Sequence, residues 1–157
     1  MKNSYLSLVK RSSAFTLLEL MVAIAIIGIL AAIAVPNIFG YINKARYVVA
    51  LSDIREISQE ANSFFLDNGR YPNNLAEIGM ADARDPWGTP YQYLSVATVN
   101  GKGKLRKDRA FNPVNSDYDL YSMGADGKSA TPFTAASSQD DIVRANNGGY
   151  LGYVKNY

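Results

Sequence analysis

A long segment of the sequence, from Leu20 to Asn43, contains no charged side chain. Its centre is almost wholly apolar, and a helix that spans a bilayer needs about 20 such residues. Lys10 and Arg11 precede the segment, and basic residues before an apolar span keep that end of it in the cytoplasm. We therefore predict one membrane-spanning helix over about residues 16–40, with the rest of the chain outside the cytoplasm.

The helical pattern continues beyond the apolar segment. Between residues 38 and 65 apolar side chains recur at steps of mainly three and four positions, while Glu56 and Glu60 belong to the opposite, charged face. Asp67-Asn68-Gly69 follows, and asparagine or glycine accepts the left-handed conformation that ends a helix. We predict a single helix over residues 15–66, apolar all round in its first half and amphipathic in its second.

A cleavable export signal has the same general form as the first third of the chain. It has a charged start, an apolar middle and an end with small residues, here Ala32-Ile33-Ala34. Two features argue against it. Glu19 lies within the apolar stretch, where a carboxylate is costly and therefore usually functional, and the helical pattern runs past the supposed cleavage point.

Composition argues against an enzyme and against a nucleic-acid partner. The chain has no cysteine and no histidine, which removes the commonest general base and the commonest transition-metal ligands. Residues 1–14 hold three of the 16 basic residues and no acid, so the rest of the chain has 13 basic against 14 acidic residues. A nearly neutral body gives no general reason to expect nucleic acid as a partner.

The remaining residues, 67–157, predict a small head that makes the whole an α+β protein. We expect a short helix or turn from Asn74 to Gly79 and two to four antiparallel strands between about residues 90 and 123. The long helix would pack on this small sheet, and the carboxyl-terminal part would be rich in loops. Between the short helix or turn and the strands, the sequence Asp85-Pro86-Trp87-Gly88-Thr89-Pro90 predicts a rigid turn that presents Trp87 to the long helix.

Acidic residues gather in the segment 117–141. They are Asp117, Asp119, Asp126, Asp140 and Asp141. Clustered oxygens without histidine or cysteine suit a hard cation such as Ca²⁺, but the spacing is not that of an EF-hand, whose glycine and closing glutamate are missing. From chemistry alone, a solvated acidic loop explains the segment equally well.

A basic run occupies residues 101–109. It is a candidate for binding phosphate or nucleic acid, but it has no interleaved aromatic residues, so a solvated hairpin tip is the better interpretation. A third interpretation places it opposite the acidic loop of a neighbouring subunit.

Several of these stretches resemble one protein family. Lys10-Arg11-Ser12-Ser13-Ala14 followed by Phe15-Thr16-Leu17-Leu18-Glu19 is similar to the leader of type IV pilins and of the pseudopilins of type II secretion systems. The stretches 68–72, 85–93 and 118–127 resemble major pseudopilins. The resemblance implies that residues 1–14 are a leader, that prepilin peptidase cuts between Ala14 and Phe15, and that Phe15 is then N-methylated. The family usually has glycine where this chain has Ala14.

The resemblance also implies roles in filament assembly. In the family, the glutamate that matches Glu19 meets the free amino terminus of a neighbouring subunit, here that of Phe15. Gly28 and Pro36 are weak points of the helix, because one lacks a side chain and the other lacks an N–H. We expect the stretch between them to be helical in the membrane and locally melted in the filament.

A calcium site is implied in the same way. The stretch 118–127 is similar to the start of the calcium loop of major pseudopilins, where main-chain carbonyls and aspartate carboxylates hold one Ca²⁺. The implied ligands are Asp126, Asp140, Asp141, Leu120, Ser122 and Asp119. The tail 143–157 matches nothing in the family, and Asp85 and Trp87 are implied to be structural.

The expected function is therefore mechanical. The resemblance implies a major pseudopilin that is anchored in the bacterial inner membrane, with its head in the periplasm, and that polymerises with itself into a periplasmic filament. Its other partners would be prepilin peptidase, membrane lipid, minor pseudopilins and the inner-membrane assembly platform. The alternative is a type IV pilin with an extracellular filament, although the lack of cysteine argues against most such pilins. A third reading, an exported periplasmic binding protein, is excluded if the mature chain starts at Phe15.

Overall fold

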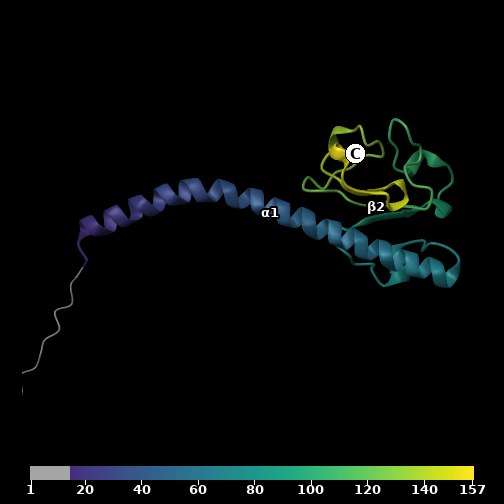
Figure 1. The fold of residues 1–157 in the computed structure, drawn as a ribbon, viewed down its shortest axis with the longest axis horizontal. Coiled ribbons are helices and arrows are strands. Elements are labelled where there is room, and N and C mark those ends of the chain that lie inside the picture. Colours follow the sequence, from purple (N-terminus) through teal and green to yellow (C-terminus); the bar gives the residue numbers. More distant parts are fainter. Residues whose placement is uncertain (1–14) are drawn as a thin grey trace, which may run out of the picture. The chain divides into compact units, whose positions relative to one another are not determined.

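The computed structural model describes residues 15–157, so the expected leader 1–14, with Ala14, lies outside the described residues. The chain divides into two compact units, of which the first ends at Tyr41 and the second spans Ile42–Tyr157. The regular elements of the described part are one long helix, a short 3₁₀ helix and four strands (Figure 1): α1 (Leu17–Asn68), η1 (Leu75–Ile78), β1 (Gln92–Ser95), β2 (Tyr118–Ser122), β3 (Ile142–Ala145) and β4 (Tyr150–Tyr153). Five further 3₁₀ turns lie between and after the strands.

In the first unit, α1 exposes its apolar side chains all round. Leu17, Ile24 and Ile33 are between 61% and 81% exposed. The most apolar 18 residues of α1 have a mean hydropathy of 2.7, and none of them is buried within the protein. By length and composition, α1 can therefore cross a membrane.

In the second unit, α1 buries one narrow stripe. The stripe consists of Ala50, Ile54, Ile57 and Ala61, each at most 2% exposed. Their spacing of four, three and four residues places them on one face of the helix. Val48 and Val49, which also fit the apolar period of the sequence, lie outside the stripe and are 57% and 49% exposed.

The end of α1 and the turn after it follow the expected signals. Gly69 has a φ of 69°, and its N–H donates to the carbonyl of Phe65 at 2.8 Å, which closes the helix. The side chain of Asn74 then accepts a hydrogen bond from the Ala76 N–H at 3.0 Å, so it caps η1. The predicted end of the long helix and the predicted short helix or turn from Asn74 to Gly79 are both confirmed.

The four strands form one antiparallel sheet in the order β1-β2-β3-β4. Leu120 of β2 lies opposite Tyr93 of β1 and Arg144 of β3, and Arg144 lies opposite Leu151 of β4. The predicted range of 90–123 was too narrow, because it contains only β1 and β2. Strands β3 and β4 form a hairpin that begins one residue before the tail 143–157 and continues into it. The sequence predicted no structure for this tail.

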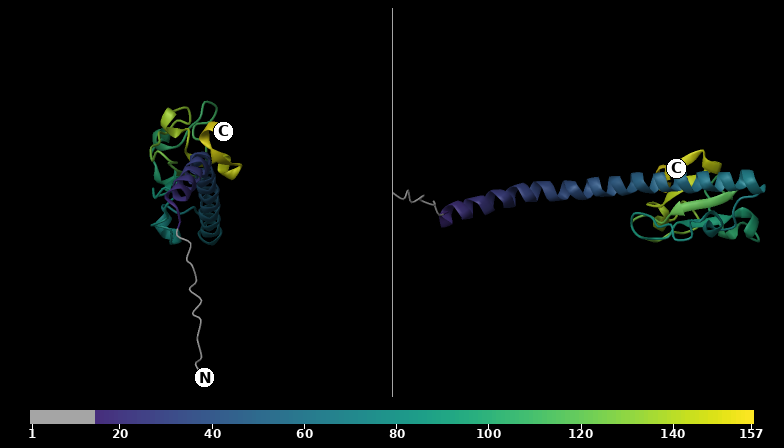
Figure 2. Two further views of the ribbon diagram at one scale, coloured as in Figure 1. Left: turned by 90° about the vertical axis from the view of Figure 1, so that its left-hand side faces the viewer. Right: turned by 90° about the horizontal axis from the view of Figure 1, so that it is seen from below.

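The sheet has two differently covered faces. Leu120 and Ile142 point to the helix and pack with the stripe on α1, whereas their neighbours Tyr121 and Val143 belong to a second cluster on the opposite face. Figure 2 shows the strands running alongside the second half of α1. The expected α+β fold, with the helix on a small antiparallel sheet, is confirmed.

Irregular chain covers the second face of the sheet. We call this cover the loop layer, which consists of residues 105–114, 129–139 and 154–157. Its apolar contacts come from Val114, Phe133 and Val154. Two of its segments are joined where the Phe133 N–H donates to the carbonyl of Lys107 at 2.9 Å.

Removing buried volume from the helical stripe should destabilise the head. We expect Ile54→Ala to lower the free energy of unfolding by about 2–5 kcal/mol, because it leaves a cavity against the sheet. Urea unfolding of the detergent-solubilised protein, followed by the fluorescence of the single tryptophan Trp87, measures this loss. Val48→Ala on the same helix is the control and should change stability by no more than about 0.5 kcal/mol. Equal losses from the two variants would contradict the packing described here.

Candidate functional site

The amino-terminal end of α1 is closed by a reciprocal pair of side chains, Thr16 and Glu19. The Thr16 N–H and hydroxyl both donate to Glu19 Oε2 at 3.0 Å, and the Glu19 N–H donates to Thr16 Oγ1 at 3.1 Å. This arrangement is a capping box, which satisfies backbone donors that a helix start leaves unpaired. Sequence reasoning missed it, although the spacing Thr-x-x-Glu is its known signal. Glu19 is therefore held in the first turn, three residues after Thr16 and close in sequence to the exposed Phe15.

The two expected weak points lie inside a continuous helix. α1 is unbroken from Leu17 to Asn68, and a side chain added at Gly28 would meet nothing within 4 Å. The helix therefore passes Gly28 and Pro36 as expected for the membrane state. Local melting between them in a filament stays a prediction.

Asp85 organises the turn around Trp87. Its Oδ1 accepts hydrogen bonds from the backbone N–H groups of Trp87, at 3.0 Å, and Thr89, at 2.9 Å. Its Oδ2 accepts from the hydroxyl of Ser122 on β2 at 2.5 Å. The carboxylate thus fixes the turn and attaches it to the sheet, while Trp87 packs against the core that contains Ile54.

A tyrosine after the turn reaches α1 directly. The Tyr91 hydroxyl donates to Asp53 Oδ2 at 2.7 Å. Burial raises the pKa of Tyr91 above its ordinary value, and the neighbouring Asp53 carboxylate raises it further. Tyr91 therefore stays protonated and serves as a permanent donor to the helix.

The structure brings together Asp126 and Asp140, which are two of the predicted metal ligands. The Asp126 N–H donates to Asp140 Oδ2 at 3.1 Å. Gly124 makes this approach possible, because a side-chain carbon there would lie 2.3 Å from the Asp140 carbonyl oxygen. Only glycine fits at that position, and it also adopts the required φ of 65°. The middle of the acidic segment at Asp126 therefore lies against its end at Asp140.

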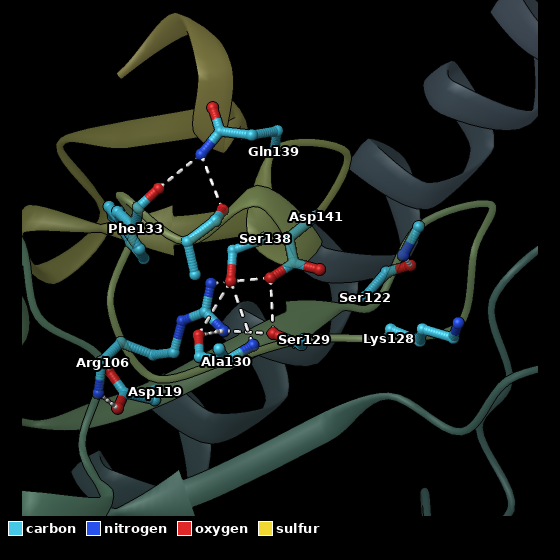
Figure 3. Close-up of polar contacts among 12 residues, drawn as sticks. Arg106, Asp119, Ser122, Lys128, Ser129, Ala130, Phe133, Ser138, Gln139 and Asp141 are labelled. Atoms are coloured by element: carbon cyan, nitrogen blue, oxygen red, sulfur yellow. Dashed lines mark hydrogen bonds and ion pairs between the residues drawn. The ribbon is translucent and has the colours of Figure 1, made fainter.

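Asp141 is fully buried, and its two carboxylate oxygens have different surroundings (Figure 3). Oδ2 accepts from Arg106 Nη2 at 2.7 Å and from the Ser129 hydroxyl at 2.6 Å. Oδ1 is also buried but has no hydrogen-bond partner among residues 15–157. Burial raises the pKa of Asp141 to about 6, against the opposing effects of Ser129 and Arg106.

Asp119 is joined to the same network through the backbone of Arg106. It is buried, and it accepts hydrogen bonds from the Arg106 backbone N–H at 2.6 Å and from Asn115 Nδ2 at 2.9 Å. Burial raises the pKa of Asp119, while these two donors lower it. Both of its oxygens are thus engaged within the protein. A metal role for Asp119 stays a prediction.

The remaining candidates, Leu120 and Ser122, lie on β2, so the segment expected as an acidic loop, 117–141, begins with a strand. Within residues 15–157, no three acidic side chains come together in a way that could hold a metal ion. A cation near Asp126, Asp140 and Asp141 would therefore need main-chain oxygens in addition.

The basic run 101–109 does not behave as one unit. Lys102 and Lys104 are exposed, as a solvated tip requires, but Arg106 is only 3% exposed. The expectation of a solvated run is wrong for Arg106. No local pattern distinguishes Arg106 from Lys104, since the three hydrogen-bond partners of its side chain, Ser129, Ala130 and Asp141, lie more than twenty residues further along the chain.

Comparison with known proteins points to one family. Residues 9–35 match the family described as the prokaryotic N-terminal methylation motif. Type II secretion system core protein G of Pseudomonas aeruginosa is 34% identical over 140 residues, which cover 76% of this chain and 87% of that protein. The protein of the same name in Aeromonas hydrophila is 36% identical over 143 residues, or 78% of this chain and 89% of that protein.

A type IV pilin matches less of its own length. The type IV major pilin protein PilA of Myxococcus xanthus is 40% identical over 96 residues, which cover 61% of this chain but 42% of that protein. No solved structure matches.

Asp85→Ala should loosen the turn that carries Trp87. The change removes the acceptor of two backbone donors and of the buried Ser122 hydroxyl, so we expect a loss of about 1–3 kcal/mol in the free energy of unfolding. Asp85→Asn keeps one carbonyl oxygen and should lose less. Urea unfolding followed by Trp87 fluorescence measures both, with the exposed Asp82→Ala as the neutral control. No loss from Asp85→Ala would show that the turn is held by its prolines alone.

Proposed function

Because this chain belongs to the family of type II secretion system core protein G, we propose that it is the major pseudopilin of such a system. In this role it is a structural subunit that polymerises into a periplasmic filament, and the growing filament drives folded proteins through the outer membrane. One observation carries the proposal. The apolar, exposed first half of α1 bears a single carboxylate, Glu19, and continues without a break into the helix of a folded head.

The membrane stores the subunit before assembly. Lys10 and Arg11 keep the amino-terminal end in the cytoplasm, so that prepilin peptidase cuts there, between Ala14 and Phe15, and methylates Phe15. The head then lies in the periplasm of a bacterium, anchored by one helix in the inner membrane. Inner-membrane lipid, the assembly platform and minor pseudopilins are the further partners. The work of the protein is mechanical, and we propose no catalytic activity for it.

Glu19 has a different partner in each state. In lipid an ionised carboxylate needs a donor, and the capping box supplies two from Thr16, both to Oε2. Neither of these hydrogen bonds uses Oε1. In the filament, the free amino group of Phe15 in the neighbouring subunit supplies a positive charge to the same carboxylate, so assembly needs no new buried charge.

We include a calcium ion at the acidic segment in the proposal. Asp141 Oδ1 is a buried carboxylate oxygen without a hydrogen-bond partner among the described residues, and such an oxygen is costly unless a cation or a donor meets it. Asp140 precedes Asp141 in the chain, and Asp126 contacts Asp140. These carboxylates, with the main-chain carbonyls of Leu120 and Ser122 on β2, would form an oxygen site of the kind that calcium prefers. The bound ion would tie the loop to the sheet.

Glu19→Ala should abolish assembly without abolishing membrane insertion. The variant is produced in a strain that lacks its own copy of the protein, and filament yield and release of a secreted protein are measured. We expect both to fall to background, because the amino terminus of the neighbouring subunit loses its charged partner. Gln59→Ala, at an exposed position in the second half of α1, controls for expression of a substituted subunit.

Mass spectrometry of the mature protein accompanies this experiment. A start at Phe15 with one added methyl group is expected for wild type and for Glu19→Ala. A start near Val35 would contradict the pilin-like interpretation altogether. Normal filaments that do not support secretion would favour the type IV pilin alternative.

Calcium should stabilise the head. At a hundredfold excess over Kd, a ligand that binds only the folded state adds about 2.7 kcal/mol, so Ca²⁺ should raise the melting temperature. Mg²⁺ should raise it much less, because it gives up its water reluctantly and requires a tighter octahedron. Asp140→Ala should remove the calcium effect, and Asp82→Ala, outside the segment, should keep it. A melting temperature indifferent to both Ca²⁺ and chelator would leave only a solvated acidic loop.

A further inference from the structure

Arg106, a member of the basic run 101–109, lies in the protein interior. The proposed function gives it no role. Its guanidinium lies between two aromatic rings, 4.3 Å from the ring centre of Tyr121 and 5.0 Å from that of Phe133. Such cation–π contacts strengthen when the cation is removed from water. The ring of Tyr121 comes from the sheet and that of Phe133 from the loop layer, so Arg106 is held between the two.

The polar contacts of Arg106 join three segments (Figure 3). Nη1 donates to the hydroxyl of Ser129, and to the carbonyl of Ala130 at 2.8 Å, while Nη2 donates to Asp141 Oδ2 at 2.7 Å. Ser129 in turn donates to the same Asp141 oxygen at 2.6 Å. The acidic loop between β2 and β3 is therefore fastened at its middle and at its end to one side chain from outside the loop.

These contacts fix the orientation of one carboxylate. Two donors hold Asp141 Oδ2, so rotation of the carboxyl group would break a buried ion pair and a hydrogen bond together. Its other oxygen, Oδ1, is then left buried without a partner among the described residues. In Figure 3, Oδ1 points away from Arg106. A carboxylate with one oxygen fixed by the protein and the other free is the arrangement that outer-shell donors give to metal ligands.

We propose that Arg106 is a positioning residue for the cation site of the acidic loop, and that it holds Asp141 through Oδ2 so that Oδ1 is available to Ca²⁺. This inference rests on the calcium site proposed above. Ser129 assists Arg106, because it donates to the same oxygen. Arg106 itself contacts no cation.

Positioning and charge balance make opposite predictions. A guanidinium close to a cation site repels the cation, so removal of its charge alone would strengthen calcium binding. If Arg106 instead orients a ligand, its removal weakens binding, typically about 10–100-fold for an outer-shell partner. The sign of the change in calcium affinity therefore decides between the two roles.

The experiment measures calcium affinity by titration calorimetry on the full chain in detergent. We expect Arg106→Gln to weaken binding by about 10–100-fold. Arg106→Lys keeps the charge but loses the planar fork that contacts Ser129, Ala130 and Asp141 together, so it should also weaken binding. Lys104→Gln removes the same charge from an exposed position of the same run and should leave the affinity unchanged.

Ser129→Ala guards against a variant that fails to fold. It deletes one hydroxyl and leaves the ion pair in place, so the head should stay folded by Trp87 fluorescence while calcium binding weakens. Limited proteolysis in chelator adds a readout that is independent of calcium, in which the segment 124–140 should be cut faster in Arg106→Gln than in wild type.

The outcomes separate the two proposals. Unchanged or stronger calcium binding in Arg106→Gln and Ser129→Ala, with wild type binding calcium, overturns the role of Arg106 alone. A wild-type protein that binds no calcium overturns the calcium site, and the positioning role falls with it. Weaker binding in both variants, together with faster cleavage of Arg106→Gln in chelator, supports the proposal.

Discussion

The head is built on the burial of one face of α1, because a lone helix has no other way to remove apolar surface from water. Ala50 and Ala61 are buried at the two ends of the stripe, and the larger Ile54 and Ile57 are buried between them. Burial of apolar side chains is the main favourable term in folding. Leu120 of β2 and Trp87 of the turn both belong to the cluster built on this stripe.

The opposite face of the sheet is covered in a different way. An amphipathic helix can cover a sheet with apolar contacts alone, but the loop layer has few apolar side chains to offer, such as Phe133 and Val154. Its backbone groups, and the buried Asp119 and Asp141 on the sheet face beneath it, need polar partners instead. Arg106 is one such partner, and a second buried arginine lies on the other face of the sheet. Arg106 pairs with Asp141 under the loop layer, and Arg144 pairs with Asp117 on the helical side.

Local signals predicted the parts of the fold that depend on local interactions. The sequence predicted the apolar period of the helix, its end at Gly69 and the short turn capped by Asn74. Neighbouring residues determine all of these features. The hairpin of β3 and β4 was not, although Asn146-Asn147-Gly148 is turn-like, because four-residue strands carry too little alternation to be recognised. The capping role of Thr16 was available from its spacing to Glu19. The burial of Arg106 was not, since only the folded chain brings Asp141, 35 residues away, to it.

A buried ion pair is a poor source of stability, because the loss of hydration of two charges offsets most of their attraction. The ion pair contributes specificity instead, since the planar guanidinium fork donates to carbonyl and carboxylate oxygens in a defined geometry. Few apolar contacts hold the loop layer, and Arg106 joins Ser129, Ala130 and Asp141 in one arrangement. A subunit that polymerises must present the same surface in every copy, because a contact that fits one arrangement of the loop fails with another. Specification of the loop by polar geometry therefore serves assembly more directly than an equal gain in stability would.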